Sequence, residues 1–119
     1  MQVKITLNPT VDVLKKRFKN RAAELPKAIK EAIYKSALEV EGAAKTFTPV
    51  DTGRLRASIF TSLYSDYAIV QPKTNYALFV HEGTRFMEAR PFMRWGADAA
   101  DRQIQINFEE AVNFAINKK

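Results

Sequence analysis

The chain has 119 residues, a net charge of +6 and no cysteine. This length fits one domain with a single modest core, and the lack of cysteine excludes disulfides and cysteine-based metal sites. The first residues, MQVKITLNPT, lack the basic and apolar regions of a signal peptide, and no apolar run approaches the roughly 20 residues that cross a bilayer. We therefore expect one domain over residues 1–119, made in the cytoplasm of its host, with no membrane contact.

The chain begins with a strand pattern followed by a helix pattern. Val3–Leu7 alternates apolar and polar residues, which predicts a short half-buried strand, and Asn8-Pro9-Thr10 ends it. From Val11 to Phe47 the apolar residues recur every three or four positions. This spacing is typical of one amphipathic helix, or of two helices in near register.

Pro26 interrupts this helical pattern. A proline inside a helix removes a backbone donor and clashes with the preceding turn, so it kinks the helix or starts a new one. We expect a short first helix that ends near Ala23 and a longer helix from about Leu25 to Thr46. Thr48-Pro49 should stop the second helix, because the residue before a proline disfavours helical geometry.

Three β-rich runs follow, at Ala57–Tyr64, Tyr67–Val70 and Tyr76–Val80. Ser65-Asp66 is suited to a hairpin turn, and Gln71–Asn75 to a loop. Consecutive strands separated by turns predict an antiparallel meander.

The last part of the chain returns to helical spacing. Pro91 stands where helices often begin, and apolar residues from Met93 to Ala115 again recur every three or four positions. Gly96 should weaken the first turns of this helix by roughly 1 kcal/mol relative to alanine. The predicted fold is α+β: a small antiparallel sheet packed by a long, kinked N-terminal helix and a C-terminal helix. A sheet this small has exposed edges, which another copy can pair with.

The basic residues are unevenly distributed. Between Lys15 and Lys30 there are seven cationic side chains and one acidic one, Glu24. This cluster is either a solvated helix face or a docking face for DNA or an acidic partner protein. The aromatic residues of the three β-rich runs resemble core positions more than an exposed platform for stacking on bases.

The sequence gives only weak support for an enzyme, and the enzymatic alternative is a hydrolase that uses His81. His81 is the one histidine, and no nucleophile motif accompanies it. The spacing of His81 from the acidic residues matches no known pattern of metal ligands, and the four separate glycines form no phosphate-binding loop. We expect no catalytic residue, no metal and no cofactor.

Two junctions between predicted elements are unusually rich in glycine, threonine and arginine. The first is TPVDTGRLRASI, residues 48–59, and the second comprises HEGTR, residues 81–85, followed by ARPFM, residues 89–93. Arginine at such turns can pair with carboxylates across a subunit interface, where arginine is enriched. The two junctions therefore favour an interaction or assembly protein.

These blocks resemble the gene-product-ten-like family of lambdoid long-tailed phages, whose members are minor tail, neck or tail-completion proteins. The resemblance is carried by Pro49, Asp51, Thr52, Gly53, Leu55, Ser58 and Ile59, then by Tyr76, Ala77, Val80, Glu82, Gly83 and Thr84, and finally by Ala89, Pro91, Phe92 and Met93. Two features depart from the family pattern: His81 precedes the Glu-Gly-Thr, and Trp95-Gly96 stands where a proline is common.

The resemblance implies a virion structural protein of a phage or prophage, located in the neck or at the head-proximal end of the tail. It is expected to join the tail tube and tail terminator to the head connector as a ring, with six copies expected in the virion. The residues expected at interfaces are Asp51, Thr52, Gly53, Arg54, Arg56, Glu82, Gly83, Thr84, Arg85 and Arg90. For Asp51, Thr52 and Gly53 the alternative is a capped turn that only directs the next strand. The alternative function is a basic DNA-binding accessory protein, and the neck protein itself could touch packaged DNA transiently.

Overall fold

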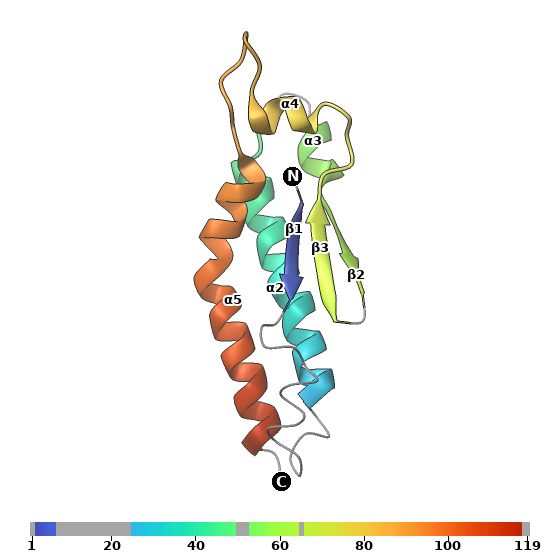
Figure 1. The fold of residues 1–119 in the computed structure, drawn as a ribbon, viewed down its shortest axis with the longest axis vertical. Helices are drawn as coiled ribbons and strands as arrows, with labels where there is room; N and C mark the ends of the chain where they lie inside the picture. The colour runs from blue at the N-terminus through green and yellow to red at the C-terminus, as the bar shows by residue number, and fades with distance from the viewer. Residues whose placement is uncertain (1, 7–24, 50–52, 65, 118–119) are drawn as a thin grey trace.

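The computed structural model describes residues 2–6, 25–49, 53–64 and 66–117. The elements in chain order are β1 (Val3–Thr6), α2 (Leu25–Phe47), α3 (Arg54–Ser58), β2 (Phe60–Leu63), β3 (Tyr67–Gln71), α4 (Ala77–Glu82) and α5 (Phe92–Asn117). They form an elongated molecule of 58 × 19 × 18 Å, whose long axis follows α2 and α5 (Figure 1).

The sheet has three antiparallel strands in the order β1-β3-β2. β2 and β3 form a hairpin, in which the Tyr64 amide donates to the Tyr67 carbonyl at 2.9 Å. β1 pairs with the other side of β3, with Ile5 opposite Ala68. The N-terminal strand β1 and strand β2 are therefore the two edges of the sheet.

The two long helices run antiparallel, and α2 packs against both α5 and the sheet (Figure 1). The stripe predicted from the sequence faces the core, since Ile29, Ile33 and Val40 of α2 are all buried. They share one core cluster with Val70 of β3 and Phe92 of α5. The predicted α+β fold, with long helices on a small antiparallel sheet, is confirmed.

Gly96 allows α5 to approach α2 unusually closely. It is buried, and a Cβ added to it would meet the backbone nitrogen of Ala44 at 2.6 Å. Beside this contact, the rings of Phe47 and Trp95 meet edge to face with their centroids 6.0 Å apart. Gly96 is expected to weaken the first turns of α5, but it also permits close packing of α5 on α2, which only a residue without a side chain allows.

Several predicted boundaries agree with the structure. The strand expected at Val3–Leu7 is β1, the helix expected from Leu25 to Thr46 is α2, and α5 begins directly after Pro91. The short helix expected to end near Ala23 lies outside the described residues, as does Leu7.

The predicted meander is correct for its first two strands only, because Ala57–Tyr64 and Tyr67–Val70 contain the paired strands β2 and β3. Tyr76–Val80 is not a strand; the run forms most of α4, in which Ala77 and His81, four residues apart, are buried on one side. Residues 54–58, part of which was expected to begin a strand, instead form α3. The reason is tertiary: β1 and β2 occupy both sides of β3, so no position beside β3 remains for another strand.

In the part of the chain that the structure describes, no helix combines the length and apolar character needed to span a bilayer.

Candidate functional site

The two junctions singled out in the sequence lie at the same end of the long axis (Figure 1). We call this the junction end; it comprises α3, α4 and the connection 83–91 between α4 and α5. Leu55 of α3, Ala77 of α4 and Phe92 of α5 belong to the common core cluster, so each part of the junction end has a buried anchor. The fold thus brings together segments that are some 30 residues apart in the sequence.

The first junction is a turn into α3. Gly53 has φ 74° and ψ −5°, a left-handed conformation that favours glycine, and its carbonyl accepts a hydrogen bond from the Ala57 amide at 3.0 Å. Arg54 is exposed, and Arg56 is half-buried. The Nε of Arg56 is buried and has no hydrogen-bond partner within the described structure. Asp51 and Thr52 lie outside the described residues, so their expected role stays a prediction.

The second junction depends on Gly83. Its φ is 80°, and an added Cβ would lie 2.7 Å from the backbone nitrogen of Ala89. The Gly83 amide donates to the Phe79 carbonyl at 2.8 Å, and the Arg90 amide donates to the Val80 carbonyl at 2.9 Å. These bonds fix both ends of the connection 83–91 against α4.

The outer part of this connection is a tight hairpin turn, which we call the tip (residues 84–87). Thr84 and Met87 pair through both backbone amides, at 2.9 and 3.1 Å. Arg85 and Phe86 are therefore the two central residues of the turn, and the Arg85 guanidinium lies 4.9 Å from the centroid of the Phe86 ring. The tip projects beyond α4 at the extreme end of the molecule (Figure 1).

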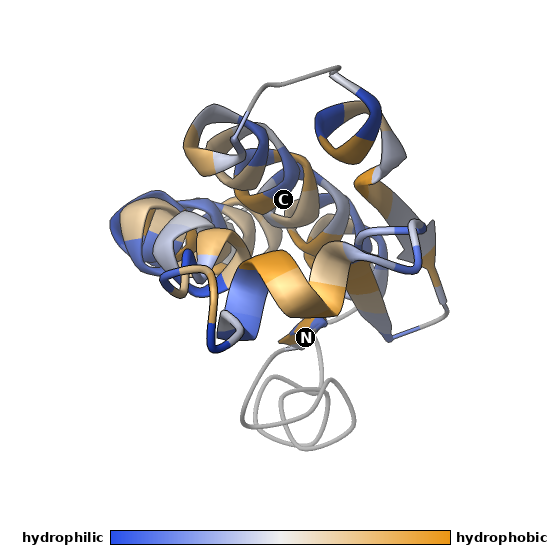
Figure 2. Cartoon of the chain, turned by 90° about the horizontal axis from the view of Figure 1, so that it is seen from above, coloured by the Kyte–Doolittle hydropathy of each residue, from blue (hydrophilic) through white to orange (hydrophobic). Residues whose placement is uncertain are grey.

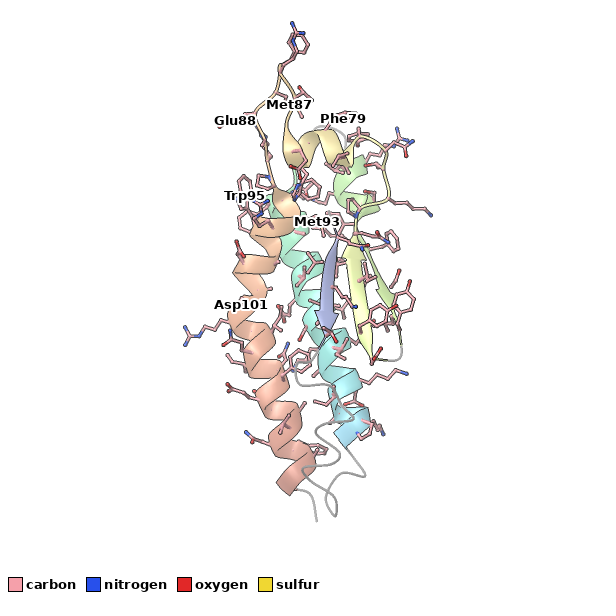
Figure 3. All side chains as sticks on the ribbon, in the orientation of Figure 1. Phe79, Met87, Glu88, Met93, Trp95 and Asp101 are labelled. Atoms are coloured by element: carbon pink, nitrogen blue, oxygen red, sulfur yellow. The ribbon has the colours of Figure 1, made fainter. Side chains whose placement is uncertain are left out.

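Large apolar side chains are exposed around the tip. Phe86 is 87% exposed and Phe79 is 57% exposed, and Leu78 and Met87 are also exposed. Figure 2 shows α4 as a mostly apolar helix lying across this end, and Figure 3 shows Phe79 at α4 and Met87 on the projecting connection. Contiguous apolar residues on a protein surface commonly mark an interaction site.

The junction end is also basic. Its exposed cations, together with those that flank it, are Arg54, Lys73, Arg85, Arg90 and Arg94, and its exposed anions are Glu82 and Glu88. The later part of α5 has the opposite balance, because Asp98, Asp101, Glu109 and Glu110 accompany Arg102 alone. The basic excess of the junction end is therefore not shared by the later part of α5.

His81 is buried and packs against neighbouring side chains. It is 6% exposed, its ring meets Phe92 edge to face, and its Nδ1 lies 2.9 Å from a carboxylate oxygen of Glu82. The Ser58 hydroxyl, a conceivable nucleophile, instead donates to the Leu55 carbonyl at 2.7 Å. Within the described residues no group of three or more histidine and acidic side chains could hold a metal ion.

The structure places the described interface residues of the sequence prediction at this end, where Arg54, Glu82, Thr84, Arg85 and Arg90 are exposed. Sequence reasoning missed Phe79 and Phe86. Phe79 was interpreted as a core residue of a strand, along with Phe60, Tyr64 and Tyr76, yet all four are exposed. The spacing of Ala77 and His81, four residues apart, is the sequence signal for a helix in which Phe79 lies on the exposed side.

Comparison of the chain with protein-family models, with curated proteins and with solved structures finds no match.

Proposed function

We propose that this chain is a structural protein of a phage or prophage head-tail junction. In this role it is a tail-completion or neck component that assembles as a ring and joins the tail tube to the head connector. The proposal begins from the resemblance of three sequence blocks to the gene-product-ten-like family.

The observation that carries the proposal furthest is the composition of the junction end. Both junctions lie at this end of the molecule, where Phe79, Phe86, Arg54, Arg85 and Arg90 are exposed. Aromatic residues and arginine are the residue types enriched at protein–protein interfaces. Such a surface suits contact with other subunits of the neck, including further copies of this chain.

The test is loss and restoration of joining. Deleting the gene from the phage or prophage that carries it should leave separate heads and tails, visible by electron microscopy. Purified protein added to the tails should restore joining and add ring-shaped density at their head-proximal ends. Normally joined, infectious particles from the deletion strain would refute the proposal.

DNA binding is the alternative, and the exposed cations Arg54, Lys73, Arg85, Arg90 and Arg94 favour it. Binding through phosphates would weaken steeply with salt. A fluorescence titration with a random-sequence duplex at 50 mM and 200 mM salt distinguishes the two functions. No binding at the lower salt concentration eliminates the DNA-binding function.

A further inference from the structure

The tip is a preformed apolar projection. Phe86 is the most exposed of the large apolar side chains in the described part of the chain. Its amide donates to Thr84 Oγ1 at 3.2 Å, and the paired amides of Thr84 and Met87 close the turn beneath it. The Phe86 ring is thus presented on a constrained turn with the Arg85 guanidinium against it. Constraint before binding reduces the entropy that association costs.

The same molecule also has a groove. It lies between α2 and α5, has a volume of about 410 Å³, and is lined by small apolar residues, Ala28, Ala32 and Ala111, with Phe114. Because the alanines fill little space, the two helices leave a hollow between them. Two carboxylates, Glu31 and Glu110, also line this groove, together with one cation, Lys35.

The tip and the groove of one molecule cannot meet. The groove involves α5 from Asn107 onward, and α5 begins at Phe92, directly after the connection that carries the tip. At 1.5 Å per residue, Asn107 lies about 22 Å along the helix axis from Phe92. The tip projects from the other end of α5, away from the groove (Figure 1). Any contact between them joins two molecules.

We propose that the tip of one copy inserts into the α2–α5 groove of a second copy. Phe86 enters between Ala32 and Ala111, and Arg85 meets the carboxylates of Glu31 and Glu110. The occupant is a second copy because this one chain supplies both complementary parts, an apolar ring with a cation and an apolar hollow with a net negative charge. The inference rests on the proposed function, since it names the contact through which copies assemble.

This contact is head-to-tail and uses two different surfaces of each copy. Repetition of such a contact gives a ring when the rotation between neighbours closes, and an open filament when it does not. The proposed ring would place the tip of each copy against the helices of its neighbour.

Disulfide trapping tests the contact directly, because the natural chain has no cysteine. Equal amounts of a Met87→Cys variant and a Lys35→Cys variant, which keep the proposed charge pair, are mixed and oxidised mildly, both free at high concentration and on purified tails. A disulfide needs Cα atoms within about 7 Å, so a mixed dimer reports tip and groove in contact. Glu39→Cys, an exposed position on the same helix outside the groove, is the matched control.

Two further variants measure the energetics. Phe86→Ser should weaken self-association, measured by analytical ultracentrifugation, by about 10- to 100-fold, which corresponds to burial of one aromatic side chain. Leu63→Ser removes an equally apolar exposed side chain away from both surfaces and should leave self-association unchanged. Arg85→Glu should weaken it as well, and adding Glu31→Arg in the same chain should restore it.

Each outcome bears on the inference. A mixed disulfide between positions 87 and 35 above the Glu39 control, with rescue by charge reversal, supports it. The inference is wrong if the natural protein assembles and joins heads to tails while Phe86→Ser behaves like Leu63→Ser; the proposed function then stands. It is also wrong if Phe86→Ser blocks joining but no mixed disulfide forms, because another neck protein then receives the tip. In a variant that carries both Ala32→Cys and Phe18→Cys, a disulfide within one chain would show instead that the chain's own segment around Phe18 occupies the groove. Failure of the deletion test removes the proposed function, whatever the disulfides show.

Discussion

Replacing Gly96 by alanine should destabilise the protein, although Gly→Ala inside a helix is normally favourable. The added Cβ would lie 2.6 Å from the nitrogen, 2.7 Å from the Cα and 2.8 Å from the Cβ of Ala44, whereas ordinary contacts begin at 3.4 Å. Two of these atoms belong to the backbone of α2 and cannot turn aside. The helices must therefore separate, which loosens the packing on both sides of the contact.

The expected magnitude follows from two opposing effects. Overpacking a close contact costs about 1–3 kcal/mol, and in this case the cost falls at the upper end because backbone atoms are involved. The better helix propensity of alanine returns about 1 kcal/mol. The net loss in the free energy of unfolding is about 1–2 kcal/mol, or a fall in Tm of about 4–8 °C for a domain of this size.

Gly42→Ala is the matched control. Gly42 is also inside a long helix, α2, but it is exposed and a Cβ added there meets nothing within 4 Å. Only the gain in helix propensity remains, so the variant should be more stable by about 0.5–1 kcal/mol. Thermal and urea unfolding followed by circular dichroism measure both variants. If Gly96→Ala is stabilised as much as Gly42→Ala, α2 and α5 do not approach as closely as described and the reasoning fails.

Three other substitutions probe the junction end and the core. Gly83→Ala places a side chain at φ 80° and ψ 172°, a backbone region that is essentially limited to glycine, and against the Ala89 backbone. It should therefore cost roughly 2 kcal/mol or more and speed amide exchange in the connection 83–91; unchanged exchange would contradict this. Asn107→Ala should cost about 1–3 kcal/mol in urea unfolding, because it removes the donor to the buried Ser36 hydroxyl, while Ser36→Ala with Asn107→Leu should stay close to the natural protein. Arg56→Met should keep or raise stability by up to about 1 kcal/mol, since it removes a buried Nε without a partner; a loss above 1 kcal/mol would show that Arg56 supports the fold.

The long elements could be predicted because each repeats its signal many times. The stripe through Ile29, Ile33 and Val40 continues over several turns of α2, so one misplaced residue changes nothing. The pattern from Met93 to Ala115 identifies α5 in the same way. Pro49 and Pro91 add local signals that do not depend on the rest of the fold.

The short elements could not be predicted, because a single helical turn carries too little periodicity. Tyr76–Val80 is rich in residues that favour strands, and only the structure shows that β1, not this run, occupies the second position beside β3. The groove was equally hidden. Ala28, Ala32 and Ala111 are visible in the sequence, but the hollow they leave depends on how α2 and α5 are aligned.

Five of the residues that carry the family resemblance have a structural role in the fold. Leu55, Ala77 and Phe92 are buried, and Gly53 and Gly83 have positive φ, so the fold alone accounts for all five. These residues build the junction end whatever it binds.

The fold does not account for several exposed residues of the junction end. Arg54, Arg85, Phe86 and Arg90 are not among the residues that carry the resemblance, and each is exposed. Burial and backbone geometry do not require arginine or phenylalanine at these places, and an 87%-exposed phenylalanine contributes little to the core. The resemblance therefore predicts the scaffold more directly than it predicts the partner. We expect these exposed side chains to determine which partner binds. The substitutions at Arg85 and Phe86 test this expectation and leave the buried residues of the scaffold unchanged.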